Sequence, residues 1–442
     1  MGRYRIYPSK NTTIIEDSPT INTGENQVME LWYGNSGLTR HLVKFDTDDY
    51  TSKYNDGKVP HITASTATTH FYNCYPIFEE TSEYSSAVHA SSVDLILQMV
   101  QQDWDEGNGF DFYGLNTNTG YADWYSATSS SAWAAAGGDF LYTVFSGHID
   151  KGTENFSGTV TNEIALWDMF TGNNFGLAIM YSGNHEALSS ATRNVLKYYT
   201  RHTNTYYKPY IQLDWDNQVR DERHRIYSGL TNRLYLYIKN NGEFSNANSV
   251  SSVTMTFSDD STHTGFTGTG IYNPMPGIYY VNFDCPNNCT AATITDTWAV
   301  QYEDSMPFMN IAQTGTTQTT LSQWTTGGTS NIINPIDYDI SIPGLQSEYY
   351  AGAIVYLEIN NLTKYTSTKN VVKNMEYKIY LKDGNNKFIM EDWDGVSYTQ
   401  DDNFIMIDTT WYLTGNTYGL QFRYNTDGST VYVDQERTFK VV

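Results

Sequence analysis

Cysteine is scarce in this chain, with Cys74, Cys285 and Cys289 as the only three among 442 residues. Three thiols do not make the dense disulfide framework of small secreted domains. The Cys285-Pro-Asn-Asn-Cys289 segment could supply half of a zinc site, but no second Cys/His pair with zinc spacing accompanies it. We therefore expect a turn between strands here, with the two thiols either reduced or oxidised, and we expect no metal and no other cofactor.

Charged side chains are also few, at 17% of the residues, and one sign dominates. Asp and Glu number 49 against 26 Lys and Arg, which gives a formal net charge of −23. Nucleic acid and anionic membrane surfaces repel such a chain, so we expect neither as a direct partner. No apolar run approaches membrane-spanning length, and the first residues lack the apolar segment of a signal peptide. These absences predict a soluble protein that is made in a cytoplasm.

Aromatic and small polar residues stand in place of the missing charges. Aromatic residues reach 15% of the chain, and 37 of them are Tyr. Much Tyr, Thr, Asn, Ser and Gly with little Lys or Glu is typical of β-sheets joined by polar loops, whereas helical proteins use more Ala, Glu, Lys and Leu. The composition predicts an all-β protein, and the length predicts two or three domains.

The first predicted domain covers residues 1–212. Short β-rich runs, among them Val28–Tyr33 and Leu42–Phe45, alternate with clusters of Gly, Asn, Asp and Ser, which is typical of a sandwich or jelly roll. Residues 91–102 fit either a strand or one face of a helix, and we favour the strand because its surroundings are β. Residues 117–138 are rich in Asn, Ser, Ala and Gly, and we expect them to form a long surface excursion.

Residues 199–237 contain the predicted junction between the first and second domains. Lys208-Pro209 stands where a strand can begin, since proline supplies no ladder N–H but fixes φ. The segment Val219–Arg223 is a short charged joint, and Leu234–Tyr237 alternates like the first strand of the next domain.

The second and third domains are predicted at 213–335 and 336–442, each as an immunoglobulin-like β-sandwich. In the second, alternating runs at Val253–Phe257 and Tyr279–Phe283 follow a turn at Asn241-Gly242, at the strand spacing of an immunoglobulin-like fold. The antibody Cys…Trp…Cys signature is missing, so only the architecture is expected. Ser322–Pro335 is the candidate linker, and hairpin turns are predicted in the third domain at Asp383-Gly384 and Asp427-Gly428.

Residues 103–111 gather four carboxylates around a Trp and two Gly. Asp103, Asp105 and Glu106 loosely imitate a calcium loop, but no Glu follows at the offset that the helical calcium-binding pattern requires. A glycosidase needs two carboxyls facing each other across a cleft, and Asp103 and Asp105 would be too close together on one strand face. We therefore expect a turn with a solvated acidic rim.

Two histidines stand beside acids, in Gly147-His148-Ile149-Asp150 and Asn184-His185-Glu186. Neither belongs to a Gly-x-Ser-x-Gly elbow, and His185 lacks the second His of a zinc protease helix. A Walker loop and a dinucleotide fingerprint are also missing. The sequence therefore offers no candidate catalytic residue, and we expect the protein not to be an enzyme.

Trp124, Tyr125 and Trp133 are the candidate interaction residues, because they lie in the excursion, where a sheet does not demand apolar rings. Aromatic faces stack on sugar rings and also make good protein interfaces. Burial beneath the loop is the competing interpretation. Between the two interactive roles we favour contact with another protein.

Several segments of the first 300 residues carry a resemblance to a known family: Tyr4–Lys10, Ile21–Asn26, Glu30–Tyr33, His41–Asp46 and Asp103–Gly109. Together they resemble β-sandwich modules related to the DNRLRE type, which occur in bacterial surface proteins and phage virion proteins. His202–Ile211, Leu234–Tyr237 and Asp296–Trp298 resemble landmarks in a group of virion structural proteins of large tailed bacteriophages.

This resemblance implies a non-enzymatic structural part of a phage particle, located in the tail, neck or capsid exterior. Such a protein is made in the host bacterial cytoplasm and docks onto other virion proteins, and we expect it to form a homo-oligomer in the particle. In the bacterial relatives the first domain often sits beside carbohydrate-active modules. The alternative function is therefore a carbohydrate-binding adhesin that recognises host surface glycans.

Overall fold

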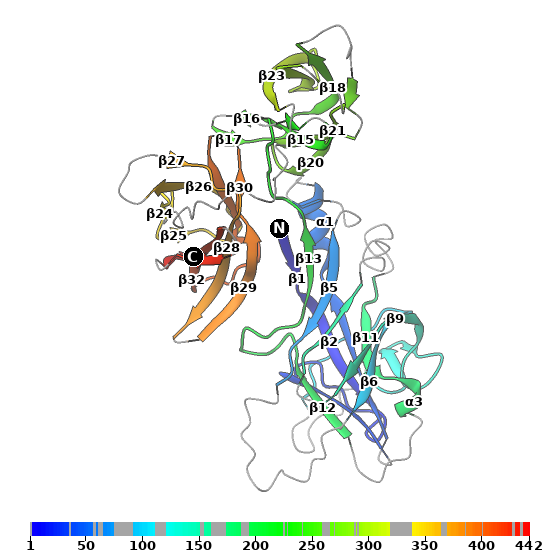
Figure 1. The fold of residues 1–442 in the computed structure, drawn as a ribbon. Helices are drawn as coiled ribbons and strands as arrows, with labels where there is room; N and C mark the ends of the chain where they lie inside the picture. The colour runs from blue at the N-terminus through cyan, green and yellow to red at the C-terminus, as the bar shows by residue number, and fades with distance from the viewer. Residues whose placement is uncertain are drawn as a thin grey trace, which may run out of the picture. The chain divides into compact units, whose positions relative to one another are not determined.

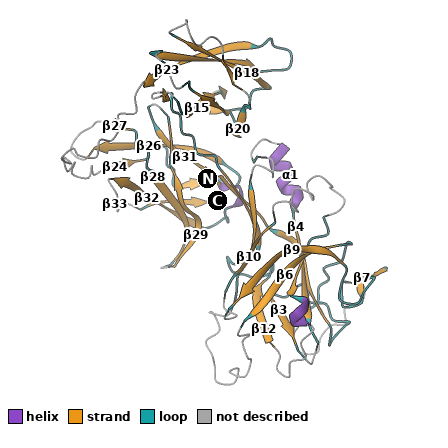
Figure 2. Ribbon diagram, turned by 45° about the vertical axis from the view of Figure 1, so that its right-hand side comes forward, coloured by secondary structure: helices purple, strands orange, loops and turns teal. Residues whose placement is uncertain are grey.

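The computed structural model describes most of the chain. It excludes residues 1, 35–36, 56–58, 61–64, 75–91, 111–120, 151–153, 161–173, 187–193, 224–225, 228, 241, 259–265, 269, 287–288, 290, 319–337, 364–368, 385, 400, 427–428 and 434–435. The regular structure of the described residues is almost all strand, arranged in mainly antiparallel sheets that pack as tandem β-sandwiches (Figures 1 and 2). The all-β prediction is confirmed. No helix among the described residues is long and apolar enough to cross a membrane.

The chain divides into two compact units, Arg3–Trp215 and Asp216–Val442, and Gly2 is grouped with the second. The first unit is a β-sandwich and the second contains two immunoglobulin-like sandwiches. The three domain ranges given above, 1–212, 213–335 and 336–442, remain predictions. The candidate linker Ser322–Pro335 lies outside the described residues.

The first unit is built on two main sheets with non-consecutive strand order. One sheet has the order β1 (Gly2–Ile6), β13 (Tyr210–Trp215), β5 (Thr66–Phe71) and β10 (Phe156–Thr159). The other has the order β2 (Pro8–Ile15), β4 (Thr39–Phe45), β11 (Leu177–Tyr181), β6 (Val93–Val100) and β9 (Phe140–Ile149). Smaller elements are the pairs β3 (Val28–Tyr33) with β12 (Asn194–Tyr199) and β7 (Ser126–Thr128) with β8 (Ser131–Ala132), and the helices α1 (Thr47–Asn55) and α3 (Gly183–Glu186).

Within the ambiguous segment 91–102, Val93–Val100 form a strand, as predicted, while residue 91 lies outside the described residues. Within β6 the buried positions alternate, so Val93, Leu95 and Leu97 enter the core while Asp94 and Ile96 are only partly covered. A period of two is the property of a sheet with one covered face. The strand that we expected after Lys208-Pro209 begins at Tyr210.

The first sandwich of Asp216–Val442 closes around one core between two sheets. The larger sheet has the order β14 (Ile226–Tyr227), β23 (Met309–Gln318), β22 (Thr293–Gln301), β18 (Ser249–Phe257) and β19 (Phe266–Gly268). The smaller has the order β15 (Thr231–Tyr237), β21 (Ile278–Asp284) and β20 (Tyr272–Met275). Side chains from both sheets meet around fully buried Trp298. The predicted strands at Val253–Phe257 and Tyr279–Phe283 are therefore confirmed.

A short hairpin extends this sandwich. Its strands β16 (Lys239–Asn240) and β17 (Glu243–Phe244) pair Asn240 with Glu243, so two residues make the turn. Gly242 has φ +90°, a conformation that glycine adopts without strain. A turn occurs at the predicted place, although Asn241 itself lies outside the described residues.

The second sandwich of this unit also has two sheets. One consists of β24 (Tyr338–Ser341), β26 (Ile354–Thr363), β31 (Asn403–Asp408) and β30 (Ser397–Tyr398), with β27 (Lys369–Asn370) beside β26. The other consists of β25 (Glu348–Tyr349), β34 (Arg437–Val441), β32 (Thr417–Thr426), β28 (Met375–Asp383) and β29 (Asn386–Gly395), with β33 (Ser429–Tyr432) beside β32. A short 3-10 helix spans Thr409–Trp411. Gly384 makes the predicted turn with φ +58°, whereas Asp427-Gly428 lies outside the described residues.

Candidate interaction site

Trp124 and Trp133 lie in the core of the first unit, so the expectation that they are exposed is wrong. Each is only 6% exposed, and both belong to a cluster that includes Trp104. Nε1 of Trp133 donates to the Asp123 carbonyl at 2.9 Å, which satisfies the indole N–H inside the protein. The residues 121–138 fold onto the sandwich with these rings beneath them. The alternative interpretation, burial beneath the loop, is therefore the correct one for both tryptophans.

Tyr125 is the one member of the trio that stays on the surface, with 55% of the residue exposed. Its neighbours Ala122 and Ala127 are fully buried, as is typical of a segment held against a core. Tyr125 alone remains available for a contact with another molecule.

Residues 103–110 of the acidic segment are tied to the protein by ion pairs, and Asp111 lies outside the described residues. Glu106 accepts two hydrogen bonds from Arg201, at 2.6 Å from Nε and 2.6 Å from Nη2, and a third from the Asn11 backbone N–H at 2.7 Å. Lys10 pairs with Asp103 at 2.8 Å. Within the described ranges no three His, Cys, Asp or Glu side chains gather as a metal site. The expected solvated rim is thus a set of structural ion pairs at Asp103 and Glu106.

The two histidines beside acids make local contacts. Exposed His148 lies 2.6 Å from Asp94, and this hydrogen bond raises the pKa of the imidazole. Oγ of Ser182 and Nδ1 of His185 lie 2.8 Å apart, a spacing that a nucleophile and its base could share. The carboxylate of the adjacent Glu186 is bound instead to Arg40, 2.7 Å from Nη2. These residues sit in one short turn and do not form a Ser-His-acid triad.

The two sandwiches of Asp216–Val442 meet at a packed junction. The Tyr398 N–H donates to the Val219 carbonyl at 2.9 Å, and the Val219 N–H donates to Oγ of Ser397 at 3.0 Å. The ring of Phe244 from the first sandwich lies 4.6 Å from that of Tyr356 in the second. Further apolar side chains from both sandwiches close the same cluster: Val219, Tyr235, Met275 and Ile278, with Phe404 and Met406 packed against them.

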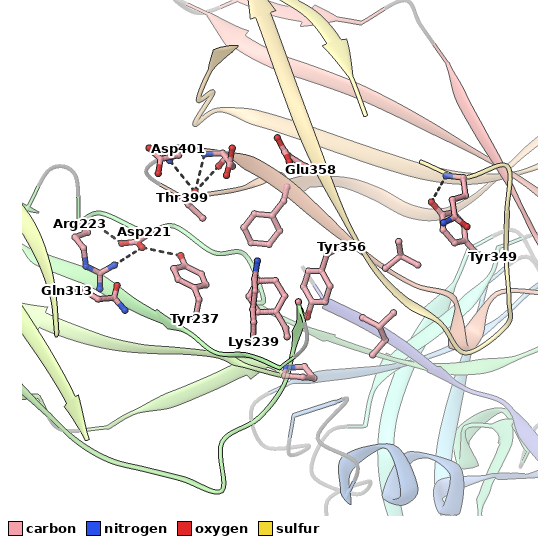
Figure 3. A pocket seen from close by; sticks show the side chains of 18 residues that line it. Asp221, Arg223, Tyr237, Lys239, Gln313, Tyr349, Tyr356, Glu358, Thr399 and Asp401 are labelled. Carbon is pink, nitrogen blue, oxygen red and sulfur yellow. Dashed lines mark hydrogen bonds and ion pairs between the residues drawn. The ribbon is translucent and has the colours of Figure 1, made fainter. Parts of the chain in front are cut away.

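A cleft of about 960 Å³ opens beside this junction (Figure 3). Five aromatic residues line it, together with four carboxylates and two cationic side chains: Tyr237, Phe244, Tyr349, Tyr356, Phe404, Asp221, Glu358, Asp401, Asp402, Arg223 and Lys239. Lys369 pairs with Glu358 at 2.6 Å and also with Asp402, which neutralises part of the rim, while Asp401 is exposed. Aromatic faces with hydrogen-bond acceptors beside them suit polyhydroxylated or peptide ligands.

Buried charges make one wall of the cleft. Arg223 lies 2.8 Å from Asp221 and 2.7 Å from Asp296, and it also donates to the Tyr235 carbonyl at 2.7 Å. Tyr237 donates to Asp221 at 3.1 Å (Figure 3). Burial raises the pKa of Asp221, and the charge of Arg223 acts against this shift. The charged joint Val219–Arg223 of the sequence is therefore a folded, ion-paired connection.

Comparisons with known proteins assign no family to this chain. No family model and no curated protein matches it. Escherichia coli alpha-2-macroglobulin matches at TM-score 0.20 and 11% identity over 51% of this chain and 20% of that chain, so this chain spans a fifth of that protein. A DUF4785 family protein from Legionella pneumophila matches at TM-score 0.18 and 8% identity over 99% of this chain and 94% of that chain. The four N-terminal Ig domains of a Dscam1 isoform match at TM-score 0.20 and 10% identity over 49% of this chain and 50% of that chain. Likeness this weak carries no argument about activity.

Proposed function

We propose that this protein is a non-enzymatic structural component of a tailed-phage virion. In this role it docks onto other virion proteins in the tail, neck or capsid exterior, and several copies are arranged symmetrically in the particle. The resemblance of the first 300 residues to phage virion proteins motivates the proposal. Tandem sandwiches support it, because they display loops and sheet edges at fixed spacing, so that many weak contacts add by avidity.

The observation that carries the proposal is the junction at Val219, Phe244 and Tyr356. Backbone hydrogen bonds and the packed rings of Phe244 and Tyr356 join the two sandwiches, where a flexible linker would leave them independent. A spacer in a particle needs such stiffness, since its docking surfaces must keep their separation. Several charged groups of the cleft are held in ion pairs, Asp221 with Arg223 and both Glu358 and Asp402 with Lys369, which also fits a structural part better than a reaction centre.

Mass spectrometry of purified phage particles tests this function. We expect peptides of this chain at a constant ratio to the major capsid protein, retained after the particles are washed in high salt. Absence of the chain from washed particles would overturn the proposal. Turnover of a substrate that is lost on changing one carboxylate or histidine would overturn its non-enzymatic part.

The second candidate function, a carbohydrate-binding adhesin, is favoured by the aromatic and acidic lining of the cleft. Binding of the intact protein to an array of immobilised host-surface glycans tests it. If the cleft holds a sugar, Phe404→Ala and Asp401→Asn abolish the signal, while Tyr125→Ala, on the exposed tyrosine of the first unit, preserves it. Loss of binding with Tyr125→Ala alone would move the glycan site to the first unit. No binding to any glycan would leave the adhesin role without support.

A further inference from the structure

Strand β23 has no described partner strand on one side over Met309–Thr316, although β14 covers its C-terminal end. Beyond β22, its partner among the described residues is β14, and β14 pairs only with Thr317 and Gln318. The stretch Met309–Thr316 pairs with β22 on one side, and no described strand lies on the other. Half of the residues in a strand point their N–H and C=O groups to each side, so this edge offers about four donors and four acceptors.

Open edges are normally protected by charged side chains, prolines or bulges that stop another strand from pairing. The other two ten-residue edge strands of the described chain carry such features. β9 shifts register twice against β6, and β29 shifts against β28 and includes Lys387, Glu391, Asp392 and Asp394. β23 reads Met-Asn-Ile-Ala-Gln-Thr-Gly-Thr-Thr-Gln, with no charge and no proline, and it pairs with β22 from Met309 to Thr316 without a shift. It is therefore ready to pair.

Exposed apolar side chains stand at the start of the same strand. Tyr302, Met306, Phe308 and Met309 are 39%, 45%, 48% and 55% exposed. Large apolar side chains gathered on a surface mark a place where another molecule docks. The unpaired edge of β23 and these exposed apolar side chains are adjacent in the sequence, so one partner could cover both.

We propose that β23 pairs antiparallel with β23 of a second copy of this chain, which joins two of these sandwiches into one continuous sheet. The lack of charged side chains in β23 is the reason to infer a second copy of this chain as the partner. Two copies that each carry a net charge of −23 repel one another over most of their surfaces, and an uncharged strand is where they can approach. The acidic pair Glu303 and Asp304 precedes the strand, so antiparallel pairing places the two acidic pairs at opposite ends of the contact.

The two-fold symmetry limits which residues can face each other in this pairing. A two-fold axis perpendicular to the sheet keeps the core faces of both copies on the same side, so the axis passes between one residue and the same residue of the other copy. The centre of the free stretch is Ala312 or Gln313. Ala312 and Thr314 are exposed on the outer face, since Ile311 packs against the core. The pair contact therefore brings identical outer-face side chains together near Ala312.

Light scattering of the full chain after gel filtration, across a wide range of concentration, tests this pairing. We expect the mass of two chains where a single chain is 50.2 kDa. Ala312→Lys should weaken the dimer about tenfold or more, because it places two like charges side by side at the axis. Thr254→Lys is the matched control, because Thr254 is also exposed and lies in β18, two strands away from β23. Thr254 pairs with Thr297 of β22, and Thr297 pairs with Ala312 of β23. It should leave the dimer intact.

Hydrogen exchange gives a readout that needs no variant. The outward amides of Met309–Thr316 should exchange more slowly as concentration rises. A chain that remains monomeric at all concentrations overturns the inference. This holds also if β23 of the monomer binds an extended segment of a different protein. A dimer that Ala312→Lys does not weaken, or one that protects other strands only, also overturns it. The inference deepens the self-association within the proposed function, and a monomer in solution would leave the particle test of that function unaffected.

Discussion

Arg223 and Asp296 form a buried ion pair in the first sandwich of Asp216–Val442, with Nη2 of Arg223 2.7 Å from Oδ2 of Asp296 and side-chain exposures of 7% and 1%. Asp221 binds the same guanidinium at 2.8 Å, and Nε1 of Trp298 donates to Asp296 at 2.6 Å. The pair thus connects the joint between domains, the wall of the cleft and the central tryptophan of the core.

Arg223→Met should destabilise this sandwich strongly. It leaves the carboxylates of Asp221 and Asp296 buried without their counter-charge, which lowers the free energy of unfolding by about 3–5 kcal/mol. Urea denaturation of both proteins measures the loss. The control is Arg220→Met, because Arg220 is exposed and its guanidinium binds Gln218. That change should stay within about 0.5 kcal/mol. Equal losses for the two variants would contradict the assigned role of Arg223.

Gly109→Ala should destabilise the first unit. A Cβ at this position would lie 1.8 Å from the carbonyl oxygen of Asn22, and backbone atoms cannot yield as a side chain does. The Asn22 side chain fixes the same place, since its Oδ1 accepts from the N–H of Gly24 at 3.0 Å and of Gly109 at 3.2 Å. We expect a loss of about 1–3 kcal/mol or more in thermal or urea unfolding. Gly183→Ala is the control, because nothing lies within 4 Å of its added Cβ.

Stability of the first unit should fall as the pH drops from 7 to 5. Burial lowers the pKa of His41 to about 3, while an unfolded histidine titrates near its ordinary value of 6.5. Between these two values the unfolded chain binds a proton that the folded chain refuses, so the stability present above pH 6.5 is lost as the pH falls. At pH 5 the loss from His41 is about 2 kcal/mol. Burial of His70, whose pKa is lowered to about 4, acts in the same direction.

Urea titrations at pH 7 and pH 5 measure this dependence. His41→Gln keeps a polar group beside Oγ of Thr13, which lies 2.9 Å from Nδ1 of His41, and should reduce the difference between the two pH values. His148→Gln is the control. Its imidazole is exposed, with a pKa that is raised mainly by the hydrogen bond to Asp94, so its removal cannot abolish the loss. An unchanged difference in His41→Gln would refute the assignment.

The sequence predicts the sheets of this protein better than its polar contacts. The strand Val93–Val100 follows from its alternation, because one-sided burial in a sheet has a period of two whatever the partner strand is. The burial of Trp124 and Trp133 does not follow, since a loop that folds back on a core has no periodicity. The pairing of Glu106 with Arg201 joins residues 95 positions apart, and no spacing rule links them. The sequence does not predict the cleft either, because two separate sandwiches supply its walls.

The thiols of Cys285 and Cys289 should be inert in the folded protein. Both cysteines are free and buried, with 4% and 2% exposure, in a turn where the Cys289 N–H donates to the Pro286 carbonyl at 3.2 Å. Burial raises the pKa of Cys285 to about 12, so the thiolate that reacts with iodoacetamide is very rare at pH 8. We expect no labelling at pH 8 without denaturant and full labelling in urea. Cys74, which is buried with a pKa raised to about 11, should behave alike. Fast labelling of Cys285 in the native protein would contradict the burial. If Cys285 and Cys289 were not labelled even in urea, and a reductant restored the labelling, the two would form a disulfide.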